Sequence, residues 1–408
     1  MRFRALSLVT AAAVALTLTS AIPASATDSP APASATGSDR GDLISATRLR
    51  TLTPAQAKSE LASEGFSSAE TRYGVTLYRL TYRTVGPTGR PTTASGLVTL
   101  PGSRPGTTLK VVSYAHGSEV FRGDAPSVTD DRWTTAPAVS YASAGFATVA
   151  PDYLGLGLGP GPHPYLDVSS ETTASVDLLR ATGEFAPTVG ATLSRDVFVT
   201  GFSQGASAAM GLARELQSDR PSGLRLAAVA PVSGAYHLRD SEIPAMLDGR
   251  LDSRWSTAYV AYLLISWNRL HDLYASPSEV FRAPYDRTLP PLFDNEHPGE
   301  QLLSALPASP SELLTPAGVR LLRQPSAPFA AALRESDRTC AGWAPRVPIR
   351  LYATSTDEQA AYSNTLACRS DLADRGVRAP VVEVGPTDHL GSVARSTVPI
   401  VRWFRSLS

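Results

Sequence analysis

The pentapeptide Gly201-Phe202-Ser203-Gln204-Gly205 constrains the fold of this chain more than any other stretch. A β-branched and aromatic run at 196–200 precedes it and predicts a buried strand, and small apolar residues at helical spacing follow it. A serine between two glycines at such a junction is typical of a tight turn that holds its hydroxyl clear of the sheet. The helix start favours negative charge there. The pattern makes Ser203 a candidate nucleophile, and an ordinary β-turn is the alternative.

Strands and helices alternate on both sides of this turn, which predicts an α/β fold with a mostly parallel sheet covered by helices on both faces. A hairpin of 76–84 and 92–100 around Gly86–Gly89 opens the folded region. The other expected strands are Lys110–Tyr114, Phe146–Ala150, Leu226–Val232, Val347–Ala353 and Pro380–Val384, and the expected helices are Thr135–Ala144, Thr172–Glu184, Gln359–Arg375 and Leu390–Phe404.

The alternation stops between residues 238 and 345, a proline-rich excursion that predicts a large, mainly helical cap inserted before the strand expected at Val347–Ala353. The core then comprises 46–237 and 346–408. Two cap helices are expected, at Ser256–Leu270 and Pro310–Leu322. The first is apolar almost all round, so it is either buried within the cap or exposed when a lid opens. We expect its tyrosines and Trp267 to line an acyl pocket.

The first 26 residues have the pattern of a signal peptide: two arginines, an apolar run, and the small-residue site Ala24-Ser25-Ala26. Residues 27–45 are rich in Ala, Ser, Thr, Pro and Gly and predict a flexible leader. The net charge is zero and no basic run occurs, so the sequence gives no support to nucleic-acid binding. No mature segment is apolar for long enough to insert stably in a membrane.

The chain has two cysteines, Cys340 and Cys368. In an exported protein an even number of cysteines favours a disulfide, and two buried thiols are the alternative. Neither cysteine has a Cys or His neighbour at ligand spacing, so no metal site is expected.

A serine nucleophile needs a histidine base and an acid that orients it. In this fold class the base follows the last strand and the acid follows the strand before it. His389 and Asp357 occupy these places. Glu358 and Asp388 are rivals for the acid, and we prefer Asp357 because Asp388 adjoins the histidine and their side chains would diverge.

The oxyanion of an acyl-transfer intermediate needs two N–H donors. The backbone N–H of Gln204 is one candidate. The second donor is expected in the loop after strand 110–114, at Gly117 or Ser118, and the choice between them stays open. His116 in the same loop is interpreted as a structural histidine.

Taken together, five motifs resemble the secretory lipases, the α/β-hydrolases related to the Candida lipase A type. The resemblance covers about residues 70–405 and departs at His116-Gly117, which is closer to bacterial esterases. It implies a secreted carboxylic-ester hydrolase that uses Ser203, Asp357 and His389 without a metal or organic cofactor. The motifs are Tyr114-Ala115-His116-Gly117, Pro151-Asp152-Tyr153-Leu154-Gly155-Leu156-Gly157, His163-Pro164-Tyr165, Gly201-Phe202-Ser203-Gln204-Gly205 and Thr387-Asp388-His389.

These observations predict an extracellular, monomeric serine hydrolase acting on a small-molecule or lipid ester, with at most transient contact with a lipid interface. Two alternatives stay open. The first is a serine peptidase on the same fold, which would need a pair of cap carboxylates to hold a substrate amine. The second is a binding module that retains the scaffold without catalysis. The candidate cap carboxylates are Asp240, Glu242, Asp294 and Glu296.

Overall fold

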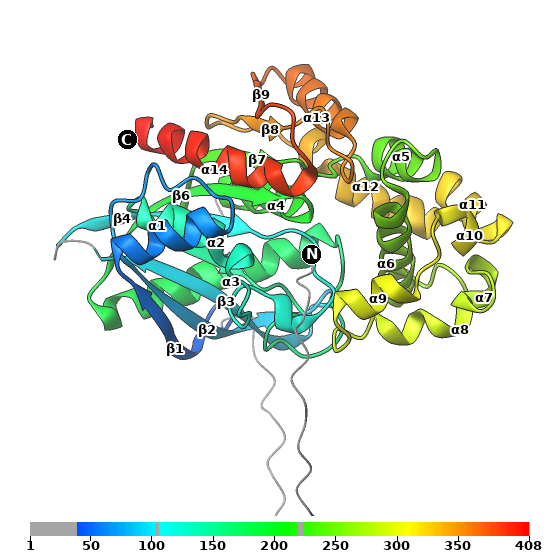
Figure 1. Cartoon of the computed structure of the whole chain (residues 1–408), viewed down its shortest axis with the longest axis horizontal. Coiled ribbons are helices and arrows are strands. Elements are labelled where there is room, and N and C mark those ends of the chain that lie inside the picture. Colours follow the sequence, from blue (N-terminus) through cyan, green and yellow to red (C-terminus); the bar gives the residue numbers. More distant parts are fainter. Residues whose placement is uncertain (1–38, 103–105, 219–222, 408) are drawn as a thin grey trace, which may run out of the picture.

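The computed structural model describes residues 39–102, 106–218 and 223–407, and the predicted signal peptide lies outside them. Within this part of the chain, nine strands form one sheet in the order β1-β2-β3-β5-β4-β6-β7-β8-β9 (Figure 1). The strands are β1 (Leu43–Leu52), β2 (Val75–Val85), β3 (Pro91–Pro101), β4 (Thr108–Ala115), β5 (Ala147–Pro151), β6 (Thr192–Phe202), β7 (Arg225–Val232), β8 (Leu351–Ala353) and β9 (Val381–Glu383).

The sheet is antiparallel at one edge and parallel in the rest. Strands β2 and β3 form the predicted hairpin, paired without interruption from Val75 opposite Pro101 to Val85 opposite Pro91. Strand β5 runs antiparallel to β3, and every pairing from β5 through β4, β6, β7 and β8 to β9 is parallel. The predicted α/β fold is confirmed, and the carboxyl ends of the parallel strands share one edge, where ligands bind in such sheets.

Two groups of helices cover the sheet, each with its own apolar cluster. Helices α3, α4 and α13 pack on one face, and α1, α2 and α14 pack on the other (Figure 1). Both faces of the central strands are therefore buried, which explains why these strands read as continuous apolar runs. The elements are α1 (Pro54–Ser63), η1 (Arg122–Asp124), α2 (Arg132–Ser143), α3 (Val168–Phe185), η2 (Ala186–Val189), α4 (Gln204–Gln217), α13 (Tyr362–Asp374) and α14 (His389–Ser406).

The fold begins earlier than the predicted end of the leader at residue 45. Strand β1 starts at Leu43 and pairs with β2, and the Gly41 N–H donates to the Arg83 carbonyl. Just before the strand, Arg40 forms an ion pair with the buried Asp177. Most β1 side chains are exposed because β1 is an edge strand. Its sequence therefore lacks the apolar alternation from which a strand is predicted.

The cap consists of ten helical elements between β7 and β8, and it lies beside one end of the sheet (Figure 1). Its apolar cluster surrounds α6 and is separate from the two clusters of the sheet. Among the described residues, no helix is both long and apolar enough to cross a bilayer. The elements are η3 (Leu238–Glu242), α5 (Ile243–Leu247), α6 (Ser253–His271), α7 (Pro277–Val280), α8 (Tyr285–Thr288), η4 (Pro290–Leu292), α9 (Gly299–Ala305), α10 (Pro310–Leu313), α11 (Pro316–Arg323) and α12 (Ala327–Ala341).

The second predicted cap helix, 310–322, is wrong as a single element. It divides into α10 and α11, because Leu314 is extended and bridges Phe281, and Thr315 caps the new helix at Gly318. A proline directly after the cap suits the first helical position.

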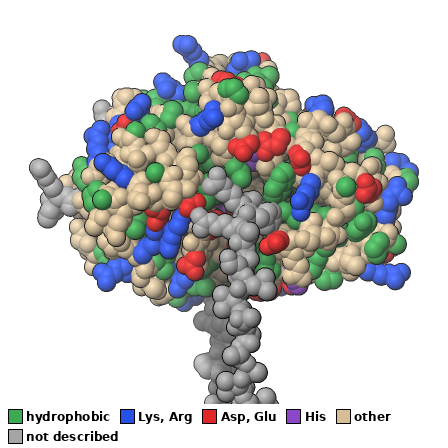
Figure 2. Space-filling model, in the orientation of Figure 1, with side chains coloured by type: hydrophobic (Ala, Val, Ile, Leu, Met, Phe, Trp, Pro, Cys, Tyr) green, Lys and Arg blue, Asp and Glu red, His purple; other side chains and the backbone are tan. Residues whose placement is uncertain are grey.

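On the surface, Lys and Arg side chains are spread around the periphery of the face drawn in Figure 2.

Candidate active site

Ser203 stands on a sharp turn between β6 and α4. Its φ of +58° lies in the left-handed region, a strained position for a side-chain-bearing residue. A Cβ on Gly201 would lie 2.0 Å from the Gly205 carbonyl oxygen, and a Cβ on Gly205 would lie 2.1 Å from that of Ala115. Both glycines are therefore required by close backbone contact. The turn leaves Ser203 half-buried at the start of a helix, where it lines a pocket.

Three side chains that are far apart in the sequence meet at this turn. The Nε2 atom of His389 lies 2.9 Å from Ser203 Oγ, and its Nδ1 atom lies 2.9 Å from each carboxylate oxygen of Asp357. Only 2% of each of the His389 and Asp357 side chains is exposed. The structure thus brings together the serine, histidine and carboxylate that the sequence singled out, in the hydrogen-bonded order that a nucleophile, a base and an orienting acid require.

Asp357 is held as an anion by its surroundings. One of its oxygens accepts hydrogen bonds from the backbone N–H groups of Gln359 and Ala360, at 3.0 and 2.9 Å. Burial acts to raise the pKa of Asp357, but the charge of His389 and the hydrogen bonds outweigh burial and lower it. A carboxylate that stays ionised can hold the imidazole with a proton on Nδ1, which leaves Nε2 free to accept the serine proton.

The two rival carboxylates bond backbone instead of the imidazole ring. Glu358 Oε2 accepts from the backbone N–H of His389 at 2.9 Å, and Asp388 caps α14 by accepting from the N–H of Gly391 at 2.7 Å. Glu358 therefore fixes where the histidine begins its helix, and Asp388 stabilises that helix. Of the three candidates, Asp357 is the one in contact with the ring.

The loop after β4 passes directly beside the nucleophile. A Cβ on Gly117 would lie 3.6 Å from Ser203 Cβ and 3.1 Å from the Phe202 ring, so only glycine fits without displacement. His116 is buried and its ring nitrogens face the carbonyl oxygens of Gly117 and Asp152. Burial lowers the pKa of His116 to about 4, so the ring is neutral and shapes the loop, as expected of a structural histidine.

No protein-family model matches the chain, and no curated protein matches it in sequence. Solved structures do. A protein from Legionella pneumophila provisionally assigned as a hydrolase is 26% identical, with a TM-score of 0.81 over 90% of this chain and 98% of that one. The rice cell wall degrading esterase LipA from Xanthomonas oryzae is 25% identical, with a TM-score of 0.76 and the same coverage. The chain has the α/β-hydrolase fold and resembles the lipase-A-like proteins.

Candida antarctica lipase A in its closed state shares the fold of this α/β-hydrolase at lower identity. It is 16% identical, with a TM-score of 0.66 over 91% of this chain and 84% of the lipase. The predicted resemblance to the Candida lipase A type is confirmed. Within the described part of this hydrolase, no group of three or more His, Cys, Asp or Glu side chains is arranged to hold a metal ion.

A buried polar network, which the sequence did not predict, fixes the residue after the nucleophile. The Gln204 amide nitrogen donates to His163 Nε2 at 2.9 Å and to Glu171 Oε1 at 2.6 Å. His163 Nδ1 donates to the Leu154 carbonyl at 2.9 Å, which leaves Nε2 as an acceptor. Burial lowers the pKa of His163 to about 3 and raises that of Glu171 to about 8. The network orients the residue whose backbone N–H is the expected oxyanion donor.

The loop that carries His163 and Tyr165 also connects the core of the fold to the cap. Ser266 of α6 donates to the His163 carbonyl at 3.1 Å and accepts from the Tyr165 N–H at 2.9 Å, and the Trp267 indole donates to the Tyr165 carbonyl at 2.8 Å. Trp267 is buried against Phe329. The expectation that Trp267 lines a pocket is therefore wrong, because its indole docks the cap on the core.

A pocket opens above Ser203 and His389, and a second pocket adjoins it under the cap. The two share Ser118, Glu119 and Tyr259. The face of α6 that lines the second pocket consists of Trp255, Ala258, Tyr259 and Tyr262. Sequence analysis correctly placed a wall of a pocket on this helix and its tyrosines, but it gave no sign of Glu119.

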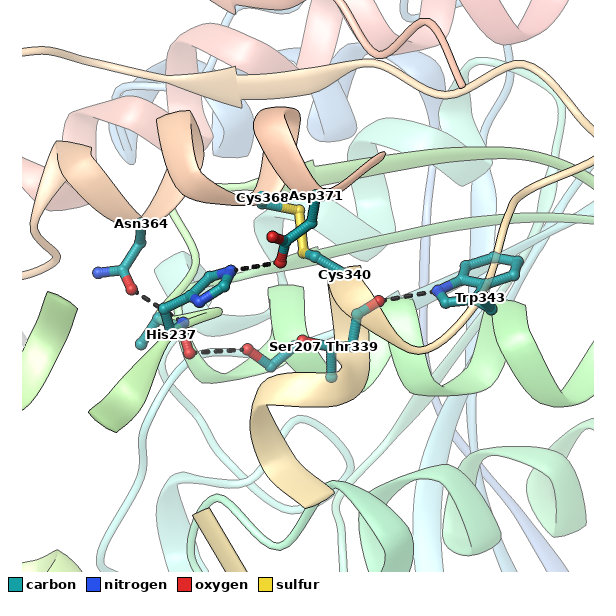
Figure 3. The surroundings of a disulfide bond; sticks show 9 residues. Ser207, His237, Thr339, Cys340, Trp343, Asn364, Cys368 and Asp371 are labelled. Carbon is teal, nitrogen blue, oxygen red and sulfur yellow. Dashed lines mark hydrogen bonds and ion pairs between the residues drawn. A yellow bond between two sulfur atoms is a disulfide. The ribbon is translucent and has the colours of Figure 1, made fainter. Parts of the chain in front are cut away.

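The predicted disulfide is present, between Cys340 on α12 and Cys368 on α13, with a Cα–Cα distance of 5.1 Å (Figure 3). Beside it, His237 Nε2 lies 2.8 Å from a carboxylate oxygen of Asp371. The bond joins the last cap helix to the helix that follows the Asp357 loop. The interval that it closes therefore contains the acid of the candidate site.

Each of the four cap carboxylates considered for an amine-binding pair has a partner of its own. Glu242 is buried and accepts from the N–H of Ala361, just after the acid loop. The remaining three form separate interactions: Glu296 pairs with Arg122, Asp294 accepts from His297 and the Glu296 N–H, and Asp240 lies beside Arg239. None of these contacts arranges two carboxylates around a common site.

Proposed function

We propose that this chain is a secreted serine ester hydrolase, a lipase or carboxylesterase, in which Ser203 is the nucleophile, His389 the base and Asp357 the orienting acid. The single observation that carries the proposal is the 2.9 Å contact of His389 Nε2 with Ser203 Oγ, together with the contact of Nδ1 with Asp357. A scaffold that served only for binding would have no need of this hydrogen-bonded order.

The geometry supports a reaction in two halves. As Ser203 Oγ attacks the ester carbonyl carbon, His389 Nε2 takes the hydroxyl proton. The carbonyl oxygen becomes an anion, stabilised by the N–H of Gln204 and by a second N–H from Gly117 or Ser118. When the intermediate collapses, the C–O bond to the alcohol breaks, and His389 gives its proton to the departing alkoxide. An acyl group remains on Ser203.

Water completes the cycle. His389 takes one proton from a water molecule as its oxygen attacks the acyl carbon, and the same oxyanion donors stabilise the second intermediate. The bond to Ser203 Oγ then breaks, and the proton on His389 returns to that oxygen. One ester and one water have become one acid and one alcohol, and the enzyme is regenerated without any other reactant.

The activities in the names of the similar proteins favour ester cleavage over other acyl transfers. The Xanthomonas oryzae protein is described as a cell wall degrading esterase, and the Candida antarctica protein is a lipase. Secretion is supported by the signal-peptide pattern of residues 1–26 and by the Cys340–Cys368 bond, which suits an oxidising compartment. We propose that residues 238–345 act as one cap over the 46–237 and 346–408 core.

The experiment that tests the proposal is hydrolysis of p-nitrophenyl esters of graded acyl length by the secreted protein. Ser203→Ala should lower kcat by about 10⁴–10⁶-fold on every ester, as the loss of a triad nucleophile does elsewhere. Ser218→Ala is the matched control, because Ser218 is an exposed serine at the far end of α4 whose hydroxyl donates to the Glu215 carbonyl of the same helix. Residual activity of Ser203→Ala within tenfold of wild type would refute the assignment.

A further inference from the structure

The second pocket, which adjoins the one above Ser203, has an unusual wall. Four of its lining residues are aromatic: Trp255, Tyr259 and Tyr262 from α6, and Phe293, which directly follows η4. Tyr262 lies against the Phe293 ring at 5.1 Å between centroids, and Trp255 stacks on Tyr259 at 5.9 Å. We call this the aromatic pocket. Its one ionisable carboxyl group is that of Glu119, and the remaining wall is largely aliphatic.

One carboxylate oxygen of Glu119, Oε2, is buried without a hydrogen-bond partner among the described residues. Glu119 as a whole is 7% exposed. The nearby hydroxyls are committed elsewhere. Tyr262 donates to the backbone carbonyl of Glu119, Tyr259 donates to Gln359, and Ser118 donates to Tyr165. A buried carboxyl oxygen without a partner destabilises the fold, and a ligand that pairs with it would remove this cost.

We propose that the aromatic pocket binds a quaternary ammonium group of the substrate, and that the natural substrates are esters of a quaternary amino alcohol. The inference rests on the proposed ester hydrolysis at Ser203. Glu119 supplies the counter-charge, and the aromatic side chains that line the pocket, Trp255, Tyr259 and Phe293 among them, add cation–π attraction. Because the two pockets share Ser118, Glu119 and Tyr259, a cation a few bonds from the scissile ester reaches the aromatic pocket while the carbonyl is at Ser203.

A cation fits this wall better than the two neutral groups that could occupy it. A substrate hydroxyl needs several hydrogen-bond partners, and the side chains that could provide them beside Glu119 are already engaged. A plain acyl chain would fit the aromatic faces but would leave the buried carboxyl oxygen unpaired. A quaternary ammonium group has no N–H to satisfy, so an anion and aromatic faces are all that it requires.

The charge on Glu119 gives the preference a pH dependence. Burial raises the pKa of Glu119 to about 8, and the neighbouring Asp124 and Asp131 act in the same direction. The other titratable groups that face it are tyrosines and the site histidine; burial keeps the tyrosines neutral by raising their pKa values. These groups are Tyr114, Tyr259, Tyr262 and His389. As the pH rises from about 6.5 to 8.5, more Glu119 is ionised and the cation should be preferred more strongly.

The test compares butyrylcholine, the butyrate ester of choline, with 3,3-dimethylbutyl butyrate. The two esters have nearly the same shape, and only the first carries a positive charge. Butyrate release is measured at a fixed pH, and the readout is the ratio of the two kcat/KM values. For wild type at pH 8 we expect the cationic ester to be favoured by about tenfold. Glu119→Gln keeps the size of the side chain and removes its charge, so the ratio should fall to within twofold of one.

The ratio is independent of how much of a variant folds, because both esters are measured on the same preparation. Trp255→Leu is a second test that remains available if Glu119→Gln fails to fold, because Trp255 is at a half-exposed position. It should lower the ratio of the two kcat/KM values severalfold. In wild type the same ratio should rise with pH. A wild-type ratio of two or less, with the neutral ester still cleaved, would overturn the proposal and indicate an acyl pocket. If neither ester is cleaved, the proposed function itself fails.

Discussion

Replacing Asp357 by Asn should cost about 10³–10⁴-fold in kcat with little loss of stability. The side-chain oxygen of Asn can still accept from the N–H groups of Gln359 and Ala360, so the acid loop keeps its hydrogen bonds. Its amide nitrogen, however, cannot accept a hydrogen bond from the Nδ1–H group of His389, as the carboxylate oxygen in that place does. The ring then loses its counter-ion and takes the wrong tautomer, with Nε2 protonated toward Ser203. At 1.36 kcal/mol for each factor of ten, the barrier rises by about 4–5 kcal/mol.

The assay is kcat on p-nitrophenyl butyrate, with thermal unfolding of each variant alongside. Glu358→Gln and Asp388→Asn are matched controls, because each removes one neighbouring negative charge without touching the imidazole. We expect each control to lower kcat by less than about tenfold. If Glu358→Gln is more damaging than Asp357→Asn, the acid has been assigned one residue too early and the reasoning is refuted.

Three further predictions concern stability. Cys340→Ala/Cys368→Ala should lower the free energy of unfolding by about 3–4 kcal/mol in guanidinium titrations and also lower activity; an unchanged midpoint would contradict this. The raised pKa of Glu171 means that its stabilising contribution is present at acid pH and is lost as the pH rises toward about 8. Glu171→Gln should therefore flatten the decline of stability with pH, which can approach about 1.4 kcal/mol per pH unit for one proton. Leu264→Ala should cost about 2–5 kcal/mol and affect esters of all lengths equally, because Leu264 is fully buried in the cap.

The parts of the fold that the sequence predicted are those set by local rules. The elbow needs Gly201 and Gly205 because a Cβ at either position would lie about 2 Å from a backbone oxygen, and that requirement is visible in five consecutive letters. The central strands are buried on both faces and so read as apolar runs. His389 and Asp357 could be placed because each follows a parallel strand within a few residues, and such strands deliver their loops to one edge of the sheet.

The features that the sequence did not predict depend on contacts between distant segments or on edges exposed to water. Strand β1 is an edge strand with mostly exposed side chains, and the break between α10 and α11 follows from a bridge to Phe281. The hydrogen bonds of Gln204 with His163 and Glu171 join helix α4 to helix α3 and to the loop that precedes α3. Glu119 reads as an ordinary loop carboxylate in the sequence, and the burial of its Oε2 atom appears only when the cap lies over it.

The most direct test of the central claim is to locate the covalent adduct of a fluorophosphonate. The hydroxyl activated by the base should attack phosphorus, displace fluoride and remain phosphonylated. Digestion with trypsin releases residues 196–214 as one peptide, which contains both Ser203 and the nearby Ser207. Fragment masses should place the whole adduct on Ser203 and none on Ser207, with no labelling of Ser203→Ala. An adduct on any other residue, or an active enzyme that takes up no label, would contradict the account.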